Sequence, residues 1–167
     1  IMSKIQNEPI CKEAYVQKVR GAMHHRAQWL YLLLDEAQKQ GLDLEPAARA
    51  AMSRCGCFQG AGMYEDWADH SSLRSFAEVF GDEDFKKYFD MEIVESTEDH
   101  LHIKFHHCPL VAGWQQIGCS DEEIERLCDI AMDGDRNIAR TCNLDFTLGD
   151  TISRGAPCCE LDFRLKK

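Results

Sequence analysis

The pattern of hydrophobic and polar residues predicts one long helix at the start of the chain. Residues 9–40 carry an apolar stripe in which Trp29, Leu30 and Leu33 recur at helical spacing. Gly41 follows the last of these repeats, and glycine is the residue that most often ends a helix. The stripe is expected to pack in the core of the protein or against a second copy of the chain.

Shorter helices are expected to follow this one. A second helix should begin near Pro46, since proline is tolerated in a first turn, and should extend to about Arg54. The glycine-rich stretch 55–62 lacks the Lys and Ser/Thr of a phosphate-binding loop, and is expected to form turns or to let another segment approach. Residues 70–80 and 82–89 are predicted to form two further short helices.

The pattern changes to an alternation at residue 91, which is typical of strands. Residues 91–96 and 100–106 predict a β-hairpin, and Pro109 should end its second strand. Leu101, Ile103 and Phe105 share the face that should be buried.

Helical spacing returns after Gly118, and two more strands follow. A capping box from Ser120 to Glu123 predicts a helix over residues 120–132. Alternation predicts strands at about 140–148 and 158–165. The predicted fold class is therefore α+β, a helical N-terminal half followed by an antiparallel sheet with covering helices. We expect one domain over residues 1–167, with a mainly helical part (1–90) and a sheet-containing part with the site (91–167).

Composition narrows the classes of partner and compartment. The 167 residues are 44% hydrophobic, which is enough for one domain with a core, and the formal net charge is −10. This acidic charge makes nucleic acid and membrane surfaces unexpected partners. The sequence shows no signal peptide or membrane-spanning segment, and its nine cysteines do not suit a disulfide framework. We therefore expect a cytoplasmic protein with reduced thiols.

Four features of the last 68 residues carry candidate chemistry. They are His106-His107-Cys108-Pro109, Cys128-Asp129, Asp133, and the segment Thr151-Ile-Ser-Arg-Gly-Ala-Pro-Cys-Cys159 that contains Arg154. Each alone has a structural explanation: a solvated sheet face for the histidines, a buried helix face for Cys128, and a solvated helix end for the aspartates. In combination they suggest a thiolate that is populated with help from neighbouring histidine or arginine side chains.

The order and spacing of these residues resemble the C-terminal signature of the L-2-amino-thiazoline-4-carboxylic acid hydrolase family. The resemblance covers about residues 90–165, and its elements are Cys108-Pro109, Gly118, Cys128 with a nearby aspartate, and Thr151-x-x-Arg-Gly-x-x-x-Cys159. The chain departs from the family pattern at two places. Leu161 occupies the final aromatic position, with Phe163 two residues later, and Ala131 stands where the family has an aspartate three residues after the helix cysteine.

The resemblance implies a hydrolase that opens a small five-membered heterocycle bearing a carboxylate, such as a 2-aminothiazoline, at a C–N or C–S bond. The nucleophile is expected to be Cys108 or Cys159, with protons handled by His106, His107, Asp129 or Asp133. Arg154 and Thr151 are expected to bind the carboxylate substrate.

Two other interpretations stay open at this stage. A metal-dependent version would use zinc or iron held by Cys108, Cys128, Cys159 and one of His102, His106 or His107, although the metal-free version is favoured because the chain has no CxxC pair. A non-catalytic domain that senses a small molecule, a metal or an oxidant is the alternative from another class. Because the long first helix is amphipathic, the chain is also expected to associate with further copies of itself as a homo-oligomer.

Overall fold

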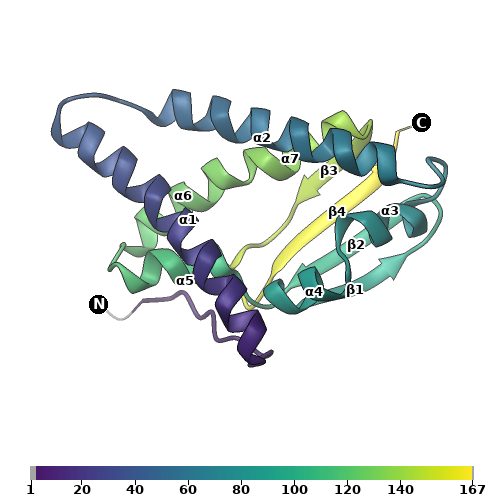
Figure 1. The fold of residues 1–167 in the computed structure, drawn as a ribbon, viewed down its shortest axis with the longest axis horizontal. Coiled ribbons are helices and arrows are strands. Elements are labelled where there is room, and N and C mark those ends of the chain that lie inside the picture. Colours follow the sequence, from purple (N-terminus) through teal and green to yellow (C-terminus); the bar gives the residue numbers. More distant parts are fainter. Residues whose placement is uncertain (1–2, 167) are drawn as a thin grey trace.

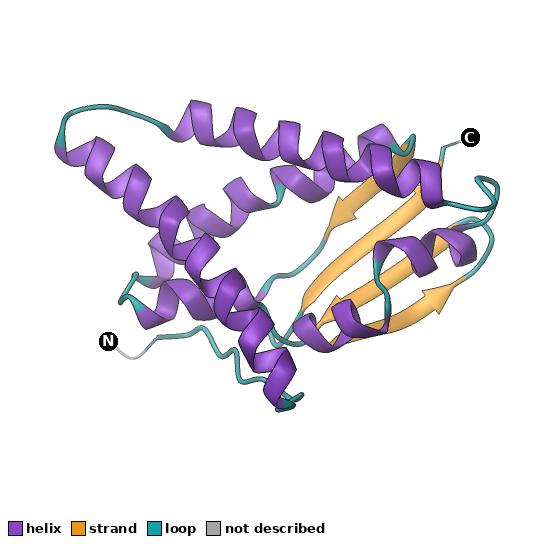
Figure 2. Cartoon of the chain, viewed as in Figure 1, coloured by secondary structure: helices purple, strands orange, loops and turns teal. Residues whose placement is uncertain are grey.

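A four-stranded antiparallel sheet with helices packed on it forms the centre of the protein (Figures 1 and 2). The structure, a computed structural model, describes residues 3–166. The helices are α1 (Ala14–Lys39), α2 (Glu45–Asp66), α3 (Leu73–Phe80), α4 (Glu83–Phe89), α5 (Pro109–Gln116), α6 (Asp121–Ala131) and α7 (Asp133–Thr141). The strands are β1 (Met91–Ser96), β2 (His100–Phe105), β3 (Leu144–Leu148) and β4 (Cys159–Leu165), and η1 (Ile152–Arg154) is a short 3-10 helix. The predicted α+β class is confirmed.

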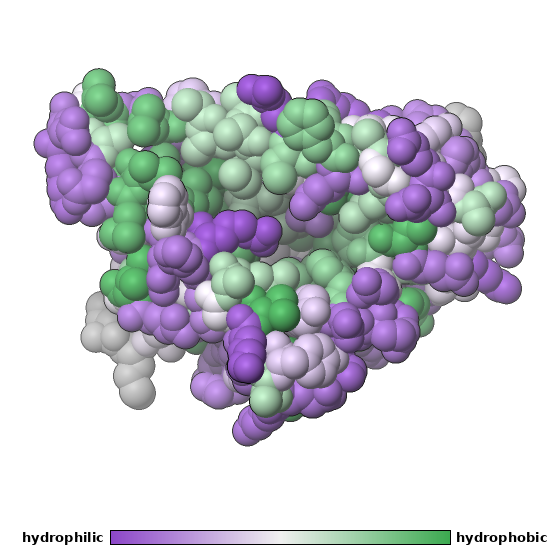
Figure 3. Space-filling view, in the orientation of Figure 1, coloured by the Kyte–Doolittle hydropathy of each residue, from purple (hydrophilic) through white to green (hydrophobic). Residues whose placement is uncertain are grey.

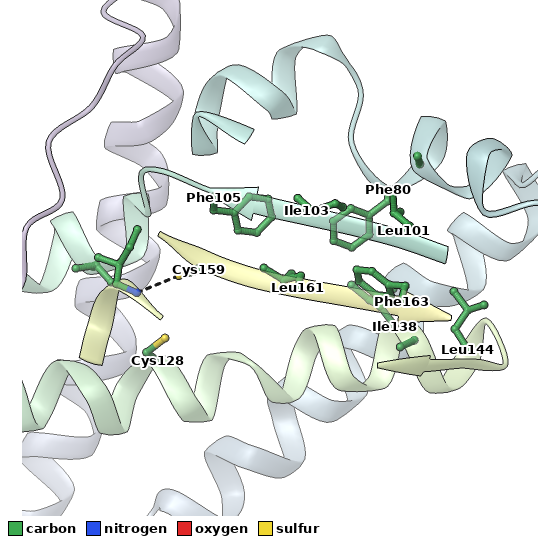
Figure 4. Close-up of a cluster of buried hydrophobic side chains, with 14 of the residues drawn as sticks. Phe80, Leu101, Ile103, Phe105, Cys128, Ile138, Leu144, Cys159, Leu161 and Phe163 are labelled. Atoms are coloured by element: carbon green, nitrogen blue, oxygen red, sulfur yellow. Dashed lines mark hydrogen bonds between the residues drawn. The ribbon is translucent and has the colours of Figure 1, made fainter. Parts of the chain in front are cut away.

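The sheet has one buried and one polar face, as the alternation in the sequence predicts. Its strands run in the order β1-β2-β4-β3, and Ile103 on β2 lies opposite Leu161 on β4. The buried face packs against the aromatic side chains of α3 and α4; for example, the ring centroids of Phe80 and Phe163 are 5.0 Å apart. Figure 4 shows these apolar side chains gathered along β2 and β4.

Helix α2 continues through the glycine-rich stretch, so the predicted turn at residues 55–62 is wrong. The reason is the close approach of α2 to α7. A Cβ on Gly60 would lie 2.9 Å from the Thr141 Cβ and 3.0 Å from the Ile138 carbonyl oxygen. The glycines therefore serve the second role expected of them, close approach of another segment, within a continuous helix.

Two helices occupy residues that the sequence pattern did not assign correctly. Pro109 ends the β2 segment as expected, but it also begins α5, where it takes a first-turn position. Residues 140–143, predicted as the start of a strand, instead complete α7 and its end. α7 ends at Thr141, and Asn143, with a positive φ of 56°, turns the chain away from helical geometry before β3.

The far end of the α1–α2 pair leaves several large apolar side chains exposed. Trp29 is 60% exposed, Leu33 58% and Leu42 57%. The predicted homo-oligomer depends on this apolar end and stays a prediction. Among the helices of residues 3–166, none is both long enough and apolar enough to cross a bilayer.

Candidate functional site

Cys108 is held at the N-terminus of α5 by the segment that precedes α1. The Asn7 side chain bonds both backbone groups of this cysteine: its amide donates to the Cys108 carbonyl (2.9 Å), and its Oδ1 accepts from the Cys108 N–H (2.8 Å). α5 itself lies tightly against α1, because Gly113 has no side chain; a Cβ there would be 2.8 Å from the His24 Cα. Cys108 is thus fixed from two sides while its side chain stays partly exposed.

Two further cysteines share the hydrophobic core with Cys108, and together we call the three the thiol cluster (Cys108, Cys128 and Cys159). Cys128 is on α6 and Cys159 is the first residue of β4, and both are 8% exposed. The Cys159 sulfur accepts a hydrogen bond of 3.3 Å from the Ile152 amide, and Figure 4 shows Cys128 beneath this strand end. Burial raises the pKa of Cys159, and negative charge on Cys108 or Cys128 would act in the same direction.

Burial keeps the thiol cluster protonated in the resting protein. Desolvation raises the pKa of Cys108 to about 12, although the backbone amides of Val111 and Leu110 act in the opposite direction. Those amides belong to the first turn of α5, whose N–H groups have no carbonyl acceptors within the helix. Burial also raises the pKa of Cys128 and of Cys159. A pKa near 12 leaves about one thiolate in 10⁵ at neutral pH, so the site needs a base to use Cys108 as a nucleophile.

Asp135, in the first turn of α7, is the acidic group that fits this need. Burial raises its pKa to about 6, and its charge in turn raises the pKa of both Cys108 and Cys128. Within residues 3–166 no lysine or arginine forms an ion pair with Asp135, although the charges of Arg136 and Arg26 act to lower its pKa. A carboxylate with a pKa near neutral, whose charge acts on two thiols, is typical of a general base.

Asp129 and Asp133, the aspartates expected from the sequence, occupy an ion-pair network instead. Arg49 pairs with Asp129 at 2.8 Å and with Asp133 at 3.1 Å, and Arg136 pairs with each of them at 2.7 Å. The arginines lower the pKa of Asp129. Sequence reasoning passed over Asp135, but one signal could have identified it. It lies three and four residues before the buried Ile138 and Ala139, so it shares the inward face of α7.

The two predicted histidines are bonded to groups outside the thiol cluster. The His106 Nε2 pairs with the Glu92 carboxylate at 2.7 Å, beside the β1 edge of the sheet. His107 is buried and its Nδ1 donates to the Asn7 carbonyl oxygen (2.9 Å). Desolvation lowers the pKa of His107 to about 4, so it is neutral at physiological pH. The structure gives His107 a clear positioning contact next to Cys108.

Arg154 and Thr151, predicted to bind substrate, border a small recess around Cys128. The recess is also lined by Ser153, and a hydrogen bond to Ser153 partly offsets the effect of burial on the pKa of Cys128. Arg154 pairs with Glu125 (3.1 Å) at the exposed rim. The Thr151 hydroxyl is buried and hydrogen bonded to the Ser153 hydroxyl (2.9 Å). The structure therefore joins Cys128 with the predicted substrate-binding segment.

The cysteine and histidine ligands weighed for zinc or iron do not form a metal-binding arrangement. Within the described part of the chain, no group of three or more His, Cys, Asp or Glu residues is placed so that it could hold a metal ion. His106 bonds to Glu92 at the sheet edge, whereas Cys128 and Cys159 are buried. The donor set that the residues offer does not fit such a site.

Comparisons with known proteins identify one matching family and one solved structure with a similar fold. The sequence model of the family described as L-2-amino-thiazoline-4-carboxylic acid hydrolase matches residues 21–163. No curated protein matches the chain. Among solved structures, a trafficking protein particle complex subunit 3 from Naegleria fowleri, covalently bound to palmitic acid in its crystal structure, has 13% sequence identity and a TM-score of 0.51. The alignment covers 85% of this chain and 96% of that chain, and at this identity it shows a shared fold.

Proposed function

Because the chain belongs to the L-2-amino-thiazoline-4-carboxylic acid hydrolase family, we propose that it opens a small five-membered heterocycle bearing a carboxylate, by hydrolysis at the thiol cluster. One observation carries the proposal. Burial raises the pKa of Asp135 to about 6, no ion-pair partner engages it among the described residues, and its charge raises the pKa of Cys108 and of Cys128. A base with this pKa is mostly ionised at neutral pH and can accept the proton of a thiol that is otherwise protonated.

Cys108 is the best-placed nucleophile of the three. It alone in the thiol cluster is partly exposed, and it lies at the N-terminus of α5, where the amides of Leu110 and Val111 act on its sulfur. Helix N-terminal amides stabilise negative charge, both on a thiolate and on an atom that gains charge during attack. Cys159 is more deeply buried, and its sulfur already accepts a hydrogen bond from the Ile152 amide.

The proposed reaction has two steps and consumes one water molecule. The Cys108 sulfur attacks the amidine carbon of a 2-aminothiazoline ring while Asp135 takes the thiol proton. The ring C–S bond then breaks, and the proton on Asp135 passes to the departing ring sulfur. Water, deprotonated by Asp135, attacks the same carbon, the bond to Cys108 breaks, and Asp135 returns the proton to the Cys108 sulfur. The product is a carbamoyl-cysteine with the mass of substrate plus water. A cationic ring bound beside Cys108 would itself lower the pKa of that thiol.

Mass spectrometry of L-2-amino-thiazoline-4-carboxylate incubated with the protein tests this function. We expect a mass gain of one water in the product, lost in Cys108→Ala and in Asp135→Asn. The matched controls are Cys119→Ala, a thiol outside the thiol cluster, and Asp133→Asn, an aspartate held by Arg49 and Arg136. Turnover that survives Cys108→Ala but not Cys159→Ala would move the nucleophile to β4. Turnover in the double variant of Cys108 and Cys159 would exclude a covalent step through either.

A binding function without turnover is the second candidate. It is favoured by the raised pKa of all three thiols and by the solved structure with the same fold, which carries covalently bound palmitic acid. In that case the protein would hold a small molecule or an acyl group at the thiol cluster and leave it unchanged. Intact-mass measurement of the purified protein, before and after hydroxylamine treatment, would reveal a thioester on one of these cysteines.

A further inference from the structure

The side of α1 that faces away from α5 presents large apolar side chains to solvent. Trp29 is 60% exposed, Leu32 47% and Leu33 58%, and their three- and four-residue spacing places them along one side of the helix. The opposite side of α1 packs on α5, where the Trp114 indole N–H donates to the Ala27 carbonyl oxygen (2.7 Å). Figure 3 shows hydrophobic side chains (green) gathered at the end of the molecule where α1 leads into the loop before α2.

Charged and polar residues continue this exposed side of α1 in both directions. We call the whole set the α1 stripe (His25, Arg26, Trp29, Leu32, Leu33 and Glu36), and every member is exposed. An apolar centre with polar ends is the usual composition of a protein interface, whose core is depleted in charge and whose rim is polar.

The conformation of Trp29 is fixed within the chain. Its indole N–H donates to the His25 Nε2 (2.9 Å), one turn earlier, and the two rings meet edge to face with centroids 6.0 Å apart. Because the polar group of Trp29 is already satisfied, the rest of the indole presents apolar surface. An aromatic side chain that is ordered before binding loses little conformational entropy, so it is well suited to the centre of an interface.

The two ends of the α1 stripe carry opposite charges. Arg26 lies at the N-terminal end, and within residues 3–166 no ion pair or hydrogen bond engages it. Glu36 lies at the C-terminal end, where its side chain is 61% exposed and pairs with the exposed Lys39 at 2.7 Å. Exposed pairs of this kind contribute little to stability, so Glu36 is free to exchange its partner.

A second copy of the chain complements this distribution of charge. A two-fold axis beside residues 30 and 31 would make the two α1 helices run antiparallel. Trp29 of each copy then meets Leu32 of the other, and Glu36 of each copy comes opposite the Arg26 end of the other. A membrane surface fits less well, since the chain has a net charge of −10 and Glu36 lies on the same side as the apolar residues.

We propose that the α1 stripe is the interface of a symmetric homodimer, in which two antiparallel α1 helices pack through Trp29, Leu32 and Leu33 and are held in register by Glu36 of each copy against Arg26 of the other. The dimer would form whether or not the thiol cluster is catalytic, because the stripe lies on the side of α1 opposite α5.

Sedimentation equilibrium of the full chain tests the apolar centre. We expect twice the mass of one chain for the wild-type protein. Trp29→Ala should raise the dissociation constant of the dimer by about 30-fold or more, as expected for the loss of a central aromatic residue. Phe58→Ala is the matched control, because Phe58 is an aromatic residue of α2 that is 73% exposed outside the α1 stripe, and it should leave the dissociation constant unchanged.

Two charge reversals test the antiparallel register. Arg26→Glu and Glu36→Arg each bring like charges together in their own dimer, so each variant alone should dimerise about 10-fold more weakly than the wild-type protein. Mixed in equal amounts, the two variants should form a heterodimer of near wild-type strength, because each reversed charge then meets its opposite. Recovery on mixing also shows that both variants are folded.

Three outcomes would overturn the proposal. A wild-type protein that stays monomeric at every concentration has no such interface, and flotation of this monomer with neutral phosphatidylcholine vesicles would assign the α1 stripe to a lipid surface instead. A dimer that is weakened by Phe58→Ala and not by Trp29→Ala would move the interface to α2. A pair of charge variants that fails to recover on mixing would contradict the antiparallel pairing of Arg26 with Glu36.

Discussion

Asn7 binds Cys108 through both backbone polar groups of the cysteine, at 2.8 and 2.9 Å, from a position 101 residues earlier in the chain. The contact resembles one rung of a β-ladder made with a side-chain amide. The contact holds the segment before α1 against the connection between β2 and α5. In the same connection His107, the residue before Cys108, donates a hydrogen bond to the Asn7 carbonyl oxygen. The position of the candidate nucleophile therefore depends on a part of the sequence that shows no candidate chemistry.

Replacing Asn7 by alanine should destabilise the fold and displace Cys108. The change leaves the Cys108 amide and carbonyl without these partners in a largely buried place, which costs about 1–3 kcal/mol. Urea unfolding followed by tryptophan fluorescence measures this loss. Gln6→Ala is the control, because Gln6 is exposed next to it, and it should stay within about 0.5 kcal/mol of the wild-type free energy of unfolding. Equal stability of the two variants would mean that the Asn7 contacts contribute nothing.

Two glycines of α2 should respond to alanine in opposite directions. A Cβ on Gly60 would meet Thr141 and Ile138 of α7 at 2.9–3.0 Å, whereas nothing lies within 4 Å of one on Gly62. We expect Gly60→Ala to lower the free energy of unfolding by about 1–3 kcal/mol through overpacking. Gly62→Ala should raise it by up to about 1 kcal/mol through helix propensity. Thermal unfolding of both variants checks the sign, and a stabilised Gly60→Ala protein would contradict the packing of α2 on α7.

The same glycines show why part of the fold could not be read from the sequence. Glycine is typical both of turns and of close helix contacts, and only the presence of α7 decides between them at Gly56 and Gly60. The sequence did not predict α7. Its buried residues Ile138 and Ala139, together with the buried Cys142 that follows it, look like a continuation of the alternating pattern of β3. The hairpin of β1 and β2 and the capped helix α6 were predictable, because local pattern and tertiary packing agree there.

The candidate site, like the fold, could be predicted from the sequence only in part. The motif residues Cys108, Cys128 and Cys159 could be found from residue type and order, and all three lie in or against the hydrophobic core. The choice among the aspartates could not, since all three belong to one acidic stretch. Arg49, on a helix distant in the sequence, neutralises Asp129 and Asp133 and leaves Asp135 unpaired. Long-range ion pairs of this kind have no local signature.

Arg20 should be far more important for stability than an exposed arginine. Its side chain is 1% exposed, pairs with Asp90 at 3.2 Å, and donates hydrogen bonds to the carbonyl oxygens of Cys11, Tyr88 and Lys87. Arg20→Met leaves the buried Asp90 charge without its partner, which should cost about 3–5 kcal/mol. Arg74→Met, which removes an exposed pair with Glu98, should cost at most about 1 kcal/mol. Chemical denaturation of both variants measures the contrast, and similar losses would refute it.

Asp135→Asn should stabilise the protein at neutral pH while it removes activity. The folded state raises the pKa of Asp135 from 3.8 to about 6, so ionising this carboxyl costs up to about 3 kcal/mol in the folded protein. Well below about pH 4 the group is protonated in both states and costs nothing; the penalty grows between about pH 4 and pH 6 and is complete above pH 6. The asparagine variant should therefore exceed wild type in free energy of unfolding at about pH 7.5 and lose that advantage at about pH 4. In the active protein, kcat/KM should fall as the pH drops below about 6, because the base becomes protonated. Asp133→Asn, which breaks pairs with Arg49 and Arg136, should instead destabilise at neutral pH. If both variants lose stability at neutral pH, Asp135 has a partner in solution and is unsuited to act as the base.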